Sequence, residues 1–543
     1  MRKIKKLSKS LIFFPILGIL FSCGSVEKTS DYSIVSLNSS NSIIKLSETE
    51  PSSGEYYGPN DVELSYTISS ITKNDIGRYT YLENDINPIK ILVVPIHFSD
   101  SKLSNGKLEE YKADINNVFN GINDSEVGFK SVKDFYNISS YGKVNLEFEV
   151  LDFYNSNTSS SLYTNEESTK SLINDALNYY NVDRTKYDGN NDGFIDAVFA
   201  IYDVNNYNNN SSSNNKNLWA YTYHSYGLDP SYEAPALSSF AWASYDFMFG
   251  GYSDKLDPHT YIHELGHLFG LYDYYDYNSL YSPLSGLDMM EYNIMDHNQY
   301  SKLVLGWIKP YVVYGNATIN VNELKENNSC IVILSDKKDL VYSKDNKYYF
   351  NPFSEYILIE PFTYDESSLN YYDLKYGYNP VNLSPDSVFT TNGYRMYHVD
   401  KRLGVVTENS NGYAFKLYDS HIPDYDMDGK FFTIISNTSN GESKKLGSLG
   451  LSTAMSNYKL NDYFNEINLI AKKTEFQNSY NSLFIHKSDN GQVKLMPISN
   501  DYLFMSGDTF NPKDYTSYFV NGGNDSSLTL NNGSTFSSSV IFE

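Results

Sequence analysis

Basic side chains are scarce in this chain of 543 residues. It has 42 Lys and Arg against 66 Asp and Glu, which gives a net charge of −24. The one basic cluster lies within the first nine residues. This balance argues against a nucleic-acid partner, because phosphates would be repelled. A disordered acidic chain is also excluded, because 41% of the residues are hydrophobic and only 20% are charged.

Long hydrophobic runs are missing as well. The longest, at residues 11–21, would rise about 16 Å as a helix, short of the roughly 30 Å membrane core. It ends in Leu-Phe-Ser-Cys23, which resembles the lipobox of bacterial lipoproteins. We interpret residues 1–22 as a lipoprotein signal peptide and expect lipid on Cys23 to anchor the protein at the extracellular face of the bacterial cell membrane. The alternative is an ordinary signal peptide with an incidental cysteine.

Cysteine is nearly absent. With Cys23 assigned to lipid, Cys330 is the only other cysteine in the chain. No intramolecular disulfide can then form. We therefore expect the fold to be held by its hydrophobic core, together with any metal ions that it binds.

Periodicity divides the remaining chain into three parts. Residues 23–84 are rich in Ser, Thr, Asn and Glu, and are predicted to form a flexible tether or a pro-segment. In residues 85–310, apolar runs such as 89–96 interleave with helical periodicities such as 108–119, as in an α+β domain. Short apolar runs between Asn, Gly, Ser and Asp clusters predict a β-rich, sandwich-like domain over 311–543.

A His-Glu-x-x-His motif lies in segment 257–270. The segment begins with Asp-Pro, which is typical of the N-cap and first position of a helix. On that helix, His263 and His267 are four residues apart and share one face, as two imidazole ligands of one zinc ion must. Glu264 lies beside them, where it can take a proton from a water activated by zinc. The motif predicts hydrolysis with Glu264 as the general base.

The third zinc ligand is expected just after the helix. Gly270 can end the helix in a left-handed conformation and turn the chain back toward the metal. Asp273 follows three residues later, and an open catalytic zinc site needs a third protein ligand. Other side chains remain alternatives for this position: Tyr272, Tyr275, Asp276 and Glu291.

Segment 288–297 resembles the methionine-containing turn beneath the zinc of metzincin-type proteases. Met295 would supply an apolar floor by packing. His297 is predicted to face the substrate and stabilise the oxyanion. The alternative for His297 is a hydrogen-bonded structural role.

Six segments occur in the order seen in immune inhibitor A-like secreted metallopeptidases. They are 93–100, 131–136, 187–196, 257–270, 354–360 and 393–400. The resemblance covers about residues 88 to 490 and implies a zinc endopeptidase with a β-rich domain after the catalytic one. One departure is Asn-Ile-Met-Asp-His at 293–297, where the family has a Ser-Leu-Met-Gly type of turn.

An acidic loop has EF-hand-like spacing. Its oxygen-bearing side chains are Asp188, Asn190, Asp192 and Asp196. Such side chains can curl around calcium, and Gly193 permits the sharp turn. The twelfth position is apolar, so the usual glutamate is missing, and the alternative is an Asx-turn loop that caps the next strand. A second loop at 424–429 repeats the spacing with a weaker match.

These patterns together predict an α+β fold, with a metzincin-like zinc protease domain followed by a β-rich domain. The expected function is a lipid-anchored zinc metalloendopeptidase, with Zn2+ as cofactor and Ca2+ as a second candidate. Its partners would be a protein or peptide substrate and the membrane, and we expect a monomer. The alternatives are a non-catalytic surface adhesin on a protease scaffold and a calcium-dependent binding module.

Overall fold

The computed structural model describes residues 88–308 with short gaps, together with strands and helices outside this range. The gaps are 123, 208–214, 226–227, 250, 253, 272, 275–283 and 285–286. Beyond residue 308, the longest described segments are 328–333, 355–366, 368–375, 390–400, 503–515 and 535–542. Cys23, the predicted signal peptide and the loop at 424–429 lie outside the described residues.

The first half of the chain is built on a six-stranded sheet. Its order is β4-β3-β7-β10-β8, with β5 beside β3. Strands β3, β4, β7 and β10 are parallel, and β8 is antiparallel to β10 at one edge. The strands are β3 (Ile89–His97), β4 (Leu146–Val150), β5 (Tyr154–Asn155), β7 (Val198–Tyr202), β8 (Tyr221–His224) and β10 (Ser239–Ser244). Two short strands, β6 (Phe194–Ile195) and β9 (Ala236–Leu237), pair with each other. They come just before β7 and β10 in the chain.

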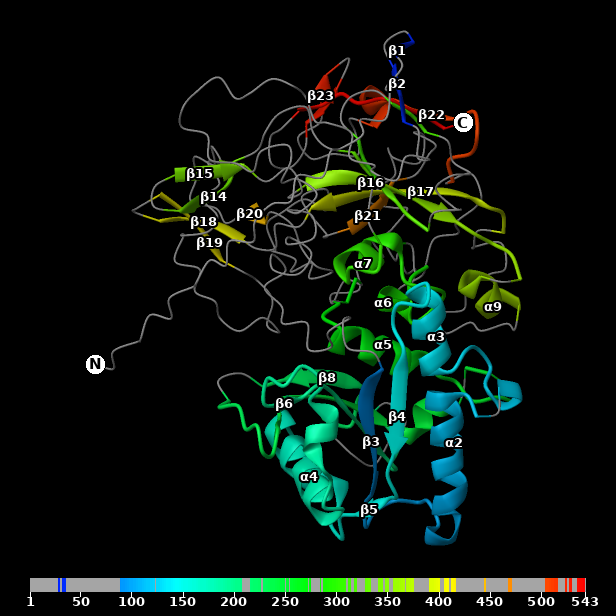
Figure 1. Cartoon of the computed structure of the whole chain (residues 1–543), viewed down its shortest axis with the longest axis vertical. Coiled ribbons are helices and arrows are strands. Elements are labelled where there is room, and N and C mark those ends of the chain that lie inside the picture. The colour runs from blue at the N-terminus through cyan, green and yellow to red at the C-terminus, as the bar shows by residue number, and fades with distance from the viewer. Residues whose placement is uncertain are drawn as a thin grey trace, which may run out of the picture.

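Helices cover both faces of this sheet, and Figure 1 shows β3 and β4 between α4 and α2. The helices are α2 (Leu108–Asn120), α3 (Val132–Ser139), α4 (Glu166–Tyr179) and α5 (His259–Leu268). Successive strand residues point to opposite faces, so Val93 packs with α2, α3 and α5 while Val94 packs with α4. Both faces are therefore apolar, as in a covered parallel sheet. The interleaved strands and helices predicted for 85–310 are confirmed.

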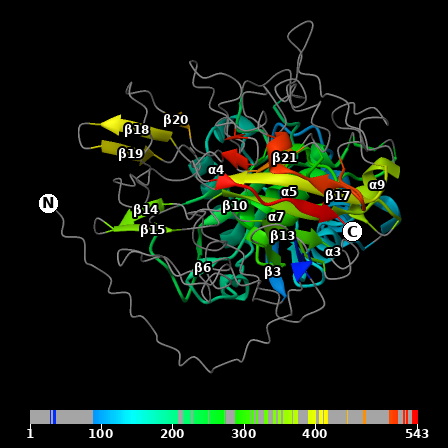
Figure 2. The ribbon, with the colours of Figure 1, turned by 90° about the horizontal axis from the view of Figure 1, so that it is seen from above.

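A second sheet lies beyond α5, and Figures 1 and 2 both place it over α7. Its order is β11-β13-β16-β17-β21. The elements of this part are α6 (Met289–Tyr292), α7 (Gln299–Val304), β11 (Tyr311–Val313), β13 (Ile331–Ile333), β16 (Glu355–Phe362), α9 (Leu369–Lys375), β17 (Gly393–Asp400) and β21 (Ile467–Ile470). Helix α9 was not predicted, because its seven residues are too few for a clear period.

One hydrophobic core crosses the predicted boundary at residue 310. The same cluster contains Leu265 of α5 and Met290 of α6, together with Val332, Leu358 and Tyr397 of the second sheet. Apolar side chains from both sides of the boundary are thus removed from water together. The second sheet is part of the structural unit that carries the zinc motif.

The chain also forms further sheets. One has the order β1-β2-β12-β26-β22 and includes residues from the predicted tether. Its strands are β1 (Lys28–Thr29), β2 (Tyr32–Val35), β12 (Ala317–Ile319), β22 (Thr509–Phe510) and β26 (Val540–Phe542). Strand β2 pairs with β12 in parallel, and the prediction of a flexible tether or a pro-segment over 23–84 stays a prediction. The other strands are β14 (Leu340–Lys344), β15 (Lys347–Phe350), β18 (Val405–Asn409), β19 (Gly412–Lys416), β20 (Lys444–Lys445), β23 (Gly523–Asn524), β24 (Ser527–Thr529) and β25 (Thr535–Phe536).

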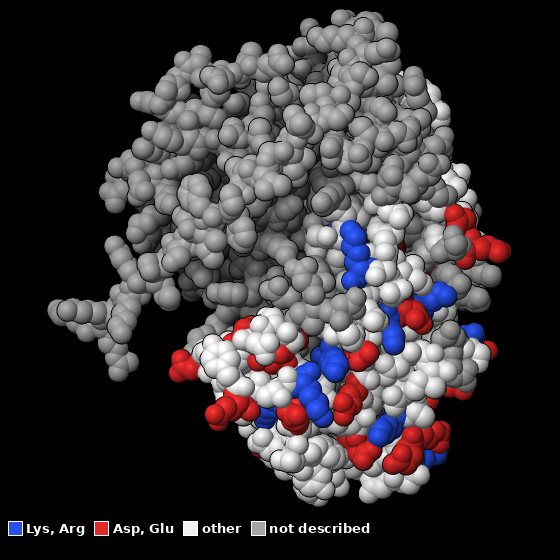
Figure 3. All heavy atoms as spheres, viewed as in Figure 1, with Lys and Arg blue, Asp and Glu red and all other residues white. Residues whose placement is uncertain are grey.

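The described part of the chain thus mixes helices with several sheets. None of its helices has the length and apolar character needed to cross a membrane. On the face drawn in Figure 3, Lys and Arg side chains are interspersed with Asp and Glu over the described atoms. The one cysteine in this part, Cys330, is free and buried just before β13.

Candidate metal centre

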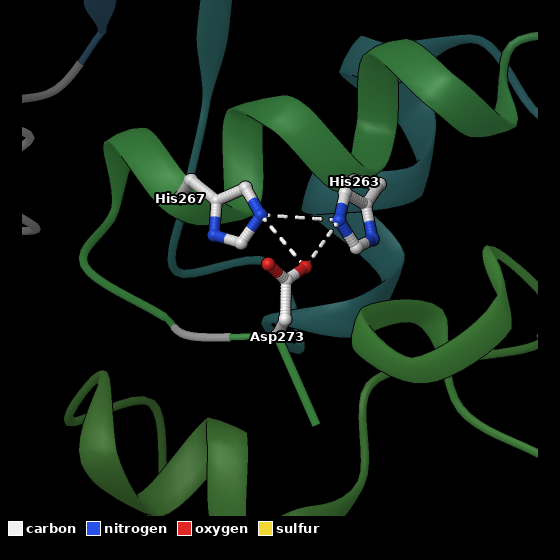
Figure 4. Close-up of side chains that lie close together, drawn as sticks. All are labelled: His263, His267 and Asp273. Carbon is white, nitrogen blue, oxygen red and sulfur yellow. Dashed lines mark hydrogen bonds and ion pairs between the residues drawn. The ribbon is translucent and has the colours of Figure 1, made fainter. Parts of the chain in front are cut away.

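Three side chains predicted as zinc ligands converge at one point (Figure 4). His263 and His267 project from successive turns of α5, and Asp273 reaches them from the segment that follows the helix. The Nε2 atoms of the two histidines are 3.1 Å apart. Oδ1 of Asp273 lies 2.9 Å from Nε2 of His263 and 3.1 Å from Nε2 of His267. Within the described residues, this is the one group of His, Cys, Asp and Glu that could hold an ion.

The donor set fits a cation such as zinc. Nδ1 of His263 lies 2.9 Å from the carbonyl of Met289, and Nδ1 of His267 lies 2.8 Å from the carbonyl of Leu271. A carbonyl only accepts, so each Nδ1 donates, and Nε2 of each ring is the atom that would offer its lone pair to a bound ion. Two lone pairs and a carboxylate then face one another. Tetrahedral zinc with bonds of about 2.0–2.1 Å would separate its ligands by about 3.3 Å, close to the observed spacing.

The close contacts also shift the pKa values of these groups. Burial lowers the pKa of His263, but the hydrogen bond and negative charge of Asp273 outweigh burial and raise it to about 9. The pKa of Asp273 is well below its usual range, since the two histidines outweigh burial there as well. A bound cation would displace the shared proton and satisfy the same negative charge.

Glycines shape the helix that carries both histidines. A Cβ on Gly266 would lie 2.6 Å from Sδ of Met290, so any larger residue would force the Met290 side chain to move. Gly270 has φ 98° and Leu271 donates to the carbonyl of Gly266, which ends the helix as predicted and redirects the chain toward Asp273. The predicted start is off by one position, since Pro258 is the N-cap.

Helix α6 positions two of the three ligands. The carbonyl of Met289 accepts from Nδ1 of His263, and the carbonyl of Met290 accepts from the N–H of Tyr274, next to Asp273. The α6 N-cap is Asp288, whose carboxylate accepts from the Met290 N–H at 2.8 Å. Burial raises the pKa of Asp288 to about 7. The backbone of α6 therefore sets the orientation of the centre.

The second sheet holds α6 in place from the other side. Arg395 of β17 donates to the carbonyl of Leu287 at 3.2 Å and forms a buried ion pair with Glu360 of β16. Glu360 also accepts from Tyr397 at 2.7 Å and from the N–H of Gln299 at the start of α7. These charges are paired, as buried charges must be. Arg395 and Glu360 thus attach Leu287, before α6, and Gln299, after α6, to the second sheet.

A buried histidine at the start of α5 was missed by the sequence analysis. His259 lies between Asp257, with Oδ1 2.6 Å from Nδ1, and Asp373 of α9, with Oδ1 2.9 Å from Nε2. Both ring nitrogens thus face carboxylates, and Asp373 also accepts from the Met295 N–H. His259 is four residues before His263 on the same helix face, a spacing that could have identified it. Asp373 gave no such signal in the sequence.

Glu264, the predicted base, is 5% exposed and lies next to the cluster on α5. Burial raises the pKa of its carboxyl, while the two neighbouring histidines lower it. The hydroxyl of Thr222 lies 3.1 Å from its Oε2 and 2.9 Å from its backbone oxygen. Thr222, on β8, is the second residue at this centre that the sequence did not reveal.

The substrate-facing role predicted for His297 is wrong. Its side chain is 2% exposed and is enclosed by the rings of Phe135, Tyr136 and Trp307. Among the described residues, neither ring nitrogen has a hydrogen-bond partner. Burial lowers the pKa of His297 far below its usual value, which keeps the ring neutral. Met295, in contrast, is fully buried in the core, as a packing role requires.

Of the alternatives for the third ligand, only Glu291 lies among the described residues, and it does not join the cluster. Tyr272, Tyr275 and Asp276 lie outside the described residues. Glu291 is buried and directs Oε1 to the N–H of Leu284 at 3.1 Å. Asp273 is thus the one described carboxylate that completes the cluster.

The first acidic loop is held by hydrogen bonds to its own backbone. Asp188 accepts from the N–H groups of Asp192 and Gly193, both at 3.0 Å, and Asp196 accepts from Gly189 at 2.9 Å. Gly193 has φ 87°, and a Cβ there would lie 2.6 Å from Cβ of Pro230, which explains the glycine. Asn190 also accepts from the Asp192 N–H. This arrangement is that of the Asx-turn alternative, and calcium stays a prediction.

Comparison with known proteins adds no assignment. No protein-family model matches the chain, and a search of curated proteins gave no match. The functional argument therefore depends on the residues of the centre.

Proposed function

We propose that this protein is a zinc-dependent endopeptidase. The observation that carries the proposal is the triangle of His263, His267 and Asp273, with the buried carboxylate of Glu264 beside it. Two neutral imidazoles and one carboxylate are a ligand set of catalytic zinc sites, which keep a further position open. A purely structural zinc site would instead close all four positions with protein side chains.

The residues divide the chemistry among them. Zinc, when bound, would lower the pKa of a water and polarise the carbonyl that this water attacks. Glu264 would accept the proton of the attacking water and pass it to the leaving amine. Its raised pKa suits this exchange, because a base that must return its proton works best with a pKa nearer to neutral. The carbonyls of Met289 and Leu271 would keep both histidines in the ligating tautomer.

A peptide substrate is supported by the strand beside the centre. β8 is the last strand in the order of its sheet, and its Thr222 contacts Glu264. An edge strand can pair with an extended peptide through backbone hydrogen bonds. A peptide bound along β8 would bring its carbonyl groups past the base and the ligands.

We further propose that lipid on Cys23 holds the enzyme at the extracellular face of the membrane. This location depends on the sequence of residues 1–23 alone. A Cys23→Ser variant should be released into the medium after export, and its retention on cells would contradict the anchor.

The function is tested with the purified protein, by metal analysis and incubation with a peptide library. One equivalent of zinc and internal cleavage of peptides, both removed by a chelator and restored by zinc, are expected. Zinc binding without cleavage of any peptide would contradict the proposed activity while leaving the metal centre in place.

A further inference from the structure

The base of the proposed reaction is contacted from outside its own helix. In each histidine of the motif, the Nδ1 atom is hydrogen-bonded to a backbone carbonyl. The partner of Glu264 is a side chain, the hydroxyl of Thr222, which stands 42 positions earlier in the chain. Thr222 is the second residue of the edge strand β8 and is half-buried.

This contact restricts the carboxylate of Glu264. A threonine hydroxyl has one proton, which here is shared between the backbone oxygen of Glu264 at 2.9 Å and Oε2 at 3.1 Å. The two contacts join both ends of the glutamate to one atom of β8. The contact uses Oε2, so Oε1 is not engaged by Thr222. A buried glutamate without such a partner would keep several rotamers.

We propose that Thr222 is a positioning residue that fixes the general base. This inference rests on the proposed function. Thr222 donates to Oε2, holds Oε1 toward the reacting water, and links the base to the strand on which a peptide would dock. A catalytic group must be held close to its productive geometry, because a shift of about 1 Å can cost roughly 100-fold in rate.

Thr222→Val tests the proposal, because valine has the same shape and removes only the hydroxyl. We expect kcat to fall by about 10-fold to 100-fold, with KM within about twofold of the parent. Zinc content and melting temperature should stay unchanged. Thr222→Ser, which restores a hydroxyl, should recover most of the rate.

The matched control is Tyr223→Phe, on the same strand but the opposite face. It removes a hydroxyl that donates to Glu167 at 2.7 Å, away from the metal centre, so its kcat should equal that of the parent. A Thr222→Val enzyme with the parental kcat, or a serine variant as slow as the valine variant, would overturn the proposal.

A second measurement keeps this inference separate from the peptidase proposal. Crystal structures of the zinc-loaded parent and Thr222→Val proteins should show the Glu264 carboxylate bonded to Thr222 in the parent and turned to another rotamer in the variant. An unchanged carboxylate would overturn the positioning role even if no peptide is cleaved. Absence of cleavage by the parent, with the rotamer change present, would contradict only the peptidase function.

Discussion

The imidazole of His259 and the carboxylate of Asp373 lie 2.9 Å apart, although 114 positions separate them in the chain. Asp373 also accepts from the N–H of Met295, so one carboxylate joins the first turn of α5 to the methionine turn. Both oxygens of this buried group are used. The helix that carries the candidate metal ligands is therefore held by a residue that lies well beyond the predicted end of the catalytic domain.

The first prediction tests this link. Asp373→Asn keeps the size of the side chain but removes the charge that faces His259. We expect the free energy of unfolding to fall by about 1.5–3 kcal/mol, the range for hydrogen bonds to charged groups. Urea unfolding measures this loss. Glu366→Gln, an exposed acid near α9, should change stability by less than about 0.5 kcal/mol. Equal effects of the two changes would show that Asp373 does not stabilise the centre.

The second prediction concerns pH. Burial lowers the pKa of His259, but Asp373 and Asp257 outweigh burial and raise it from 6.5 to about 9. Because the folded pKa is the higher one, the stabilisation is complete below pH 6.5 and is lost as the pH rises through 9. The melting temperature of the zinc-loaded protein should fall over this window.

The matched variant for the pH prediction is His259→Gln. It should be less stable at pH 7, by about 3–5 kcal/mol for a broken buried ion pair, and should lose less stability between pH 7 and 10 than the parent. Parallel curves for parent and variant across this range would contradict a charged His259.

The third prediction separates catalysis from binding. Glu264→Gln should keep zinc and fold but lose about 100-fold to 10,000-fold in peptidase rate, because an amide cannot accept the proton. Metal analysis and peptide hydrolysis are measured on the same sample, with Glu366→Gln as a control. Cleavage within tenfold of the parent would mean that another group is the base.

The fourth prediction concerns the ligands. His263→Ala or His267→Ala should abolish tight zinc binding, and Asp273→Ala should weaken it substantially, because each removes one of three converging ligand atoms. Zinc titration against a competing chelator measures the affinities. Glu291→Gln, which alters the described rival carboxylate, should leave affinity unchanged. Full zinc occupancy in Asp273→Ala, with loss in Glu291→Gln, would reassign the third ligand.

The local part of this centre could be predicted from the sequence. His263, Glu264 and His267 lie on one helix, so helix geometry sets their relative positions. Gly270 and Asp273 follow within a few residues, and the left-handed conformation of Gly270 directs the chain that carries Asp273. The strands and helices of 85–310 were predictable for the same reason, because their periods are local and strong.

The long-range part could not be predicted. Thr222 and Asp373 are brought to the centre by strand order and by a core shared between two sheets, neither of which has a local period. For His297, in contrast, the sequence suggested a role at the site that its burial does not support. The position of His297 just after Met295 suggested a catalytic role. Its burial depends on Phe135 and Tyr136 of α3, which lie much earlier in the chain, as well as on the nearby Trp307.

The last prediction decides between the two interpretations of the first acidic loop. Asp192 is exposed and its Oδ1 accepts from the N–H of Phe194 at 2.9 Å, a bond that an amide oxygen can also accept. Asp192→Asn therefore preserves the Asx turn but removes a charge that calcium would need. If calcium binds, it stabilises the native state by about 2.7 kcal/mol at a hundredfold excess over Kd. We expect the melting temperature of the parent to rise with calcium and the variant to need more calcium for the same rise. A parent indifferent to calcium from micromolar to about 10 mM would leave the loop as a backbone cap alone.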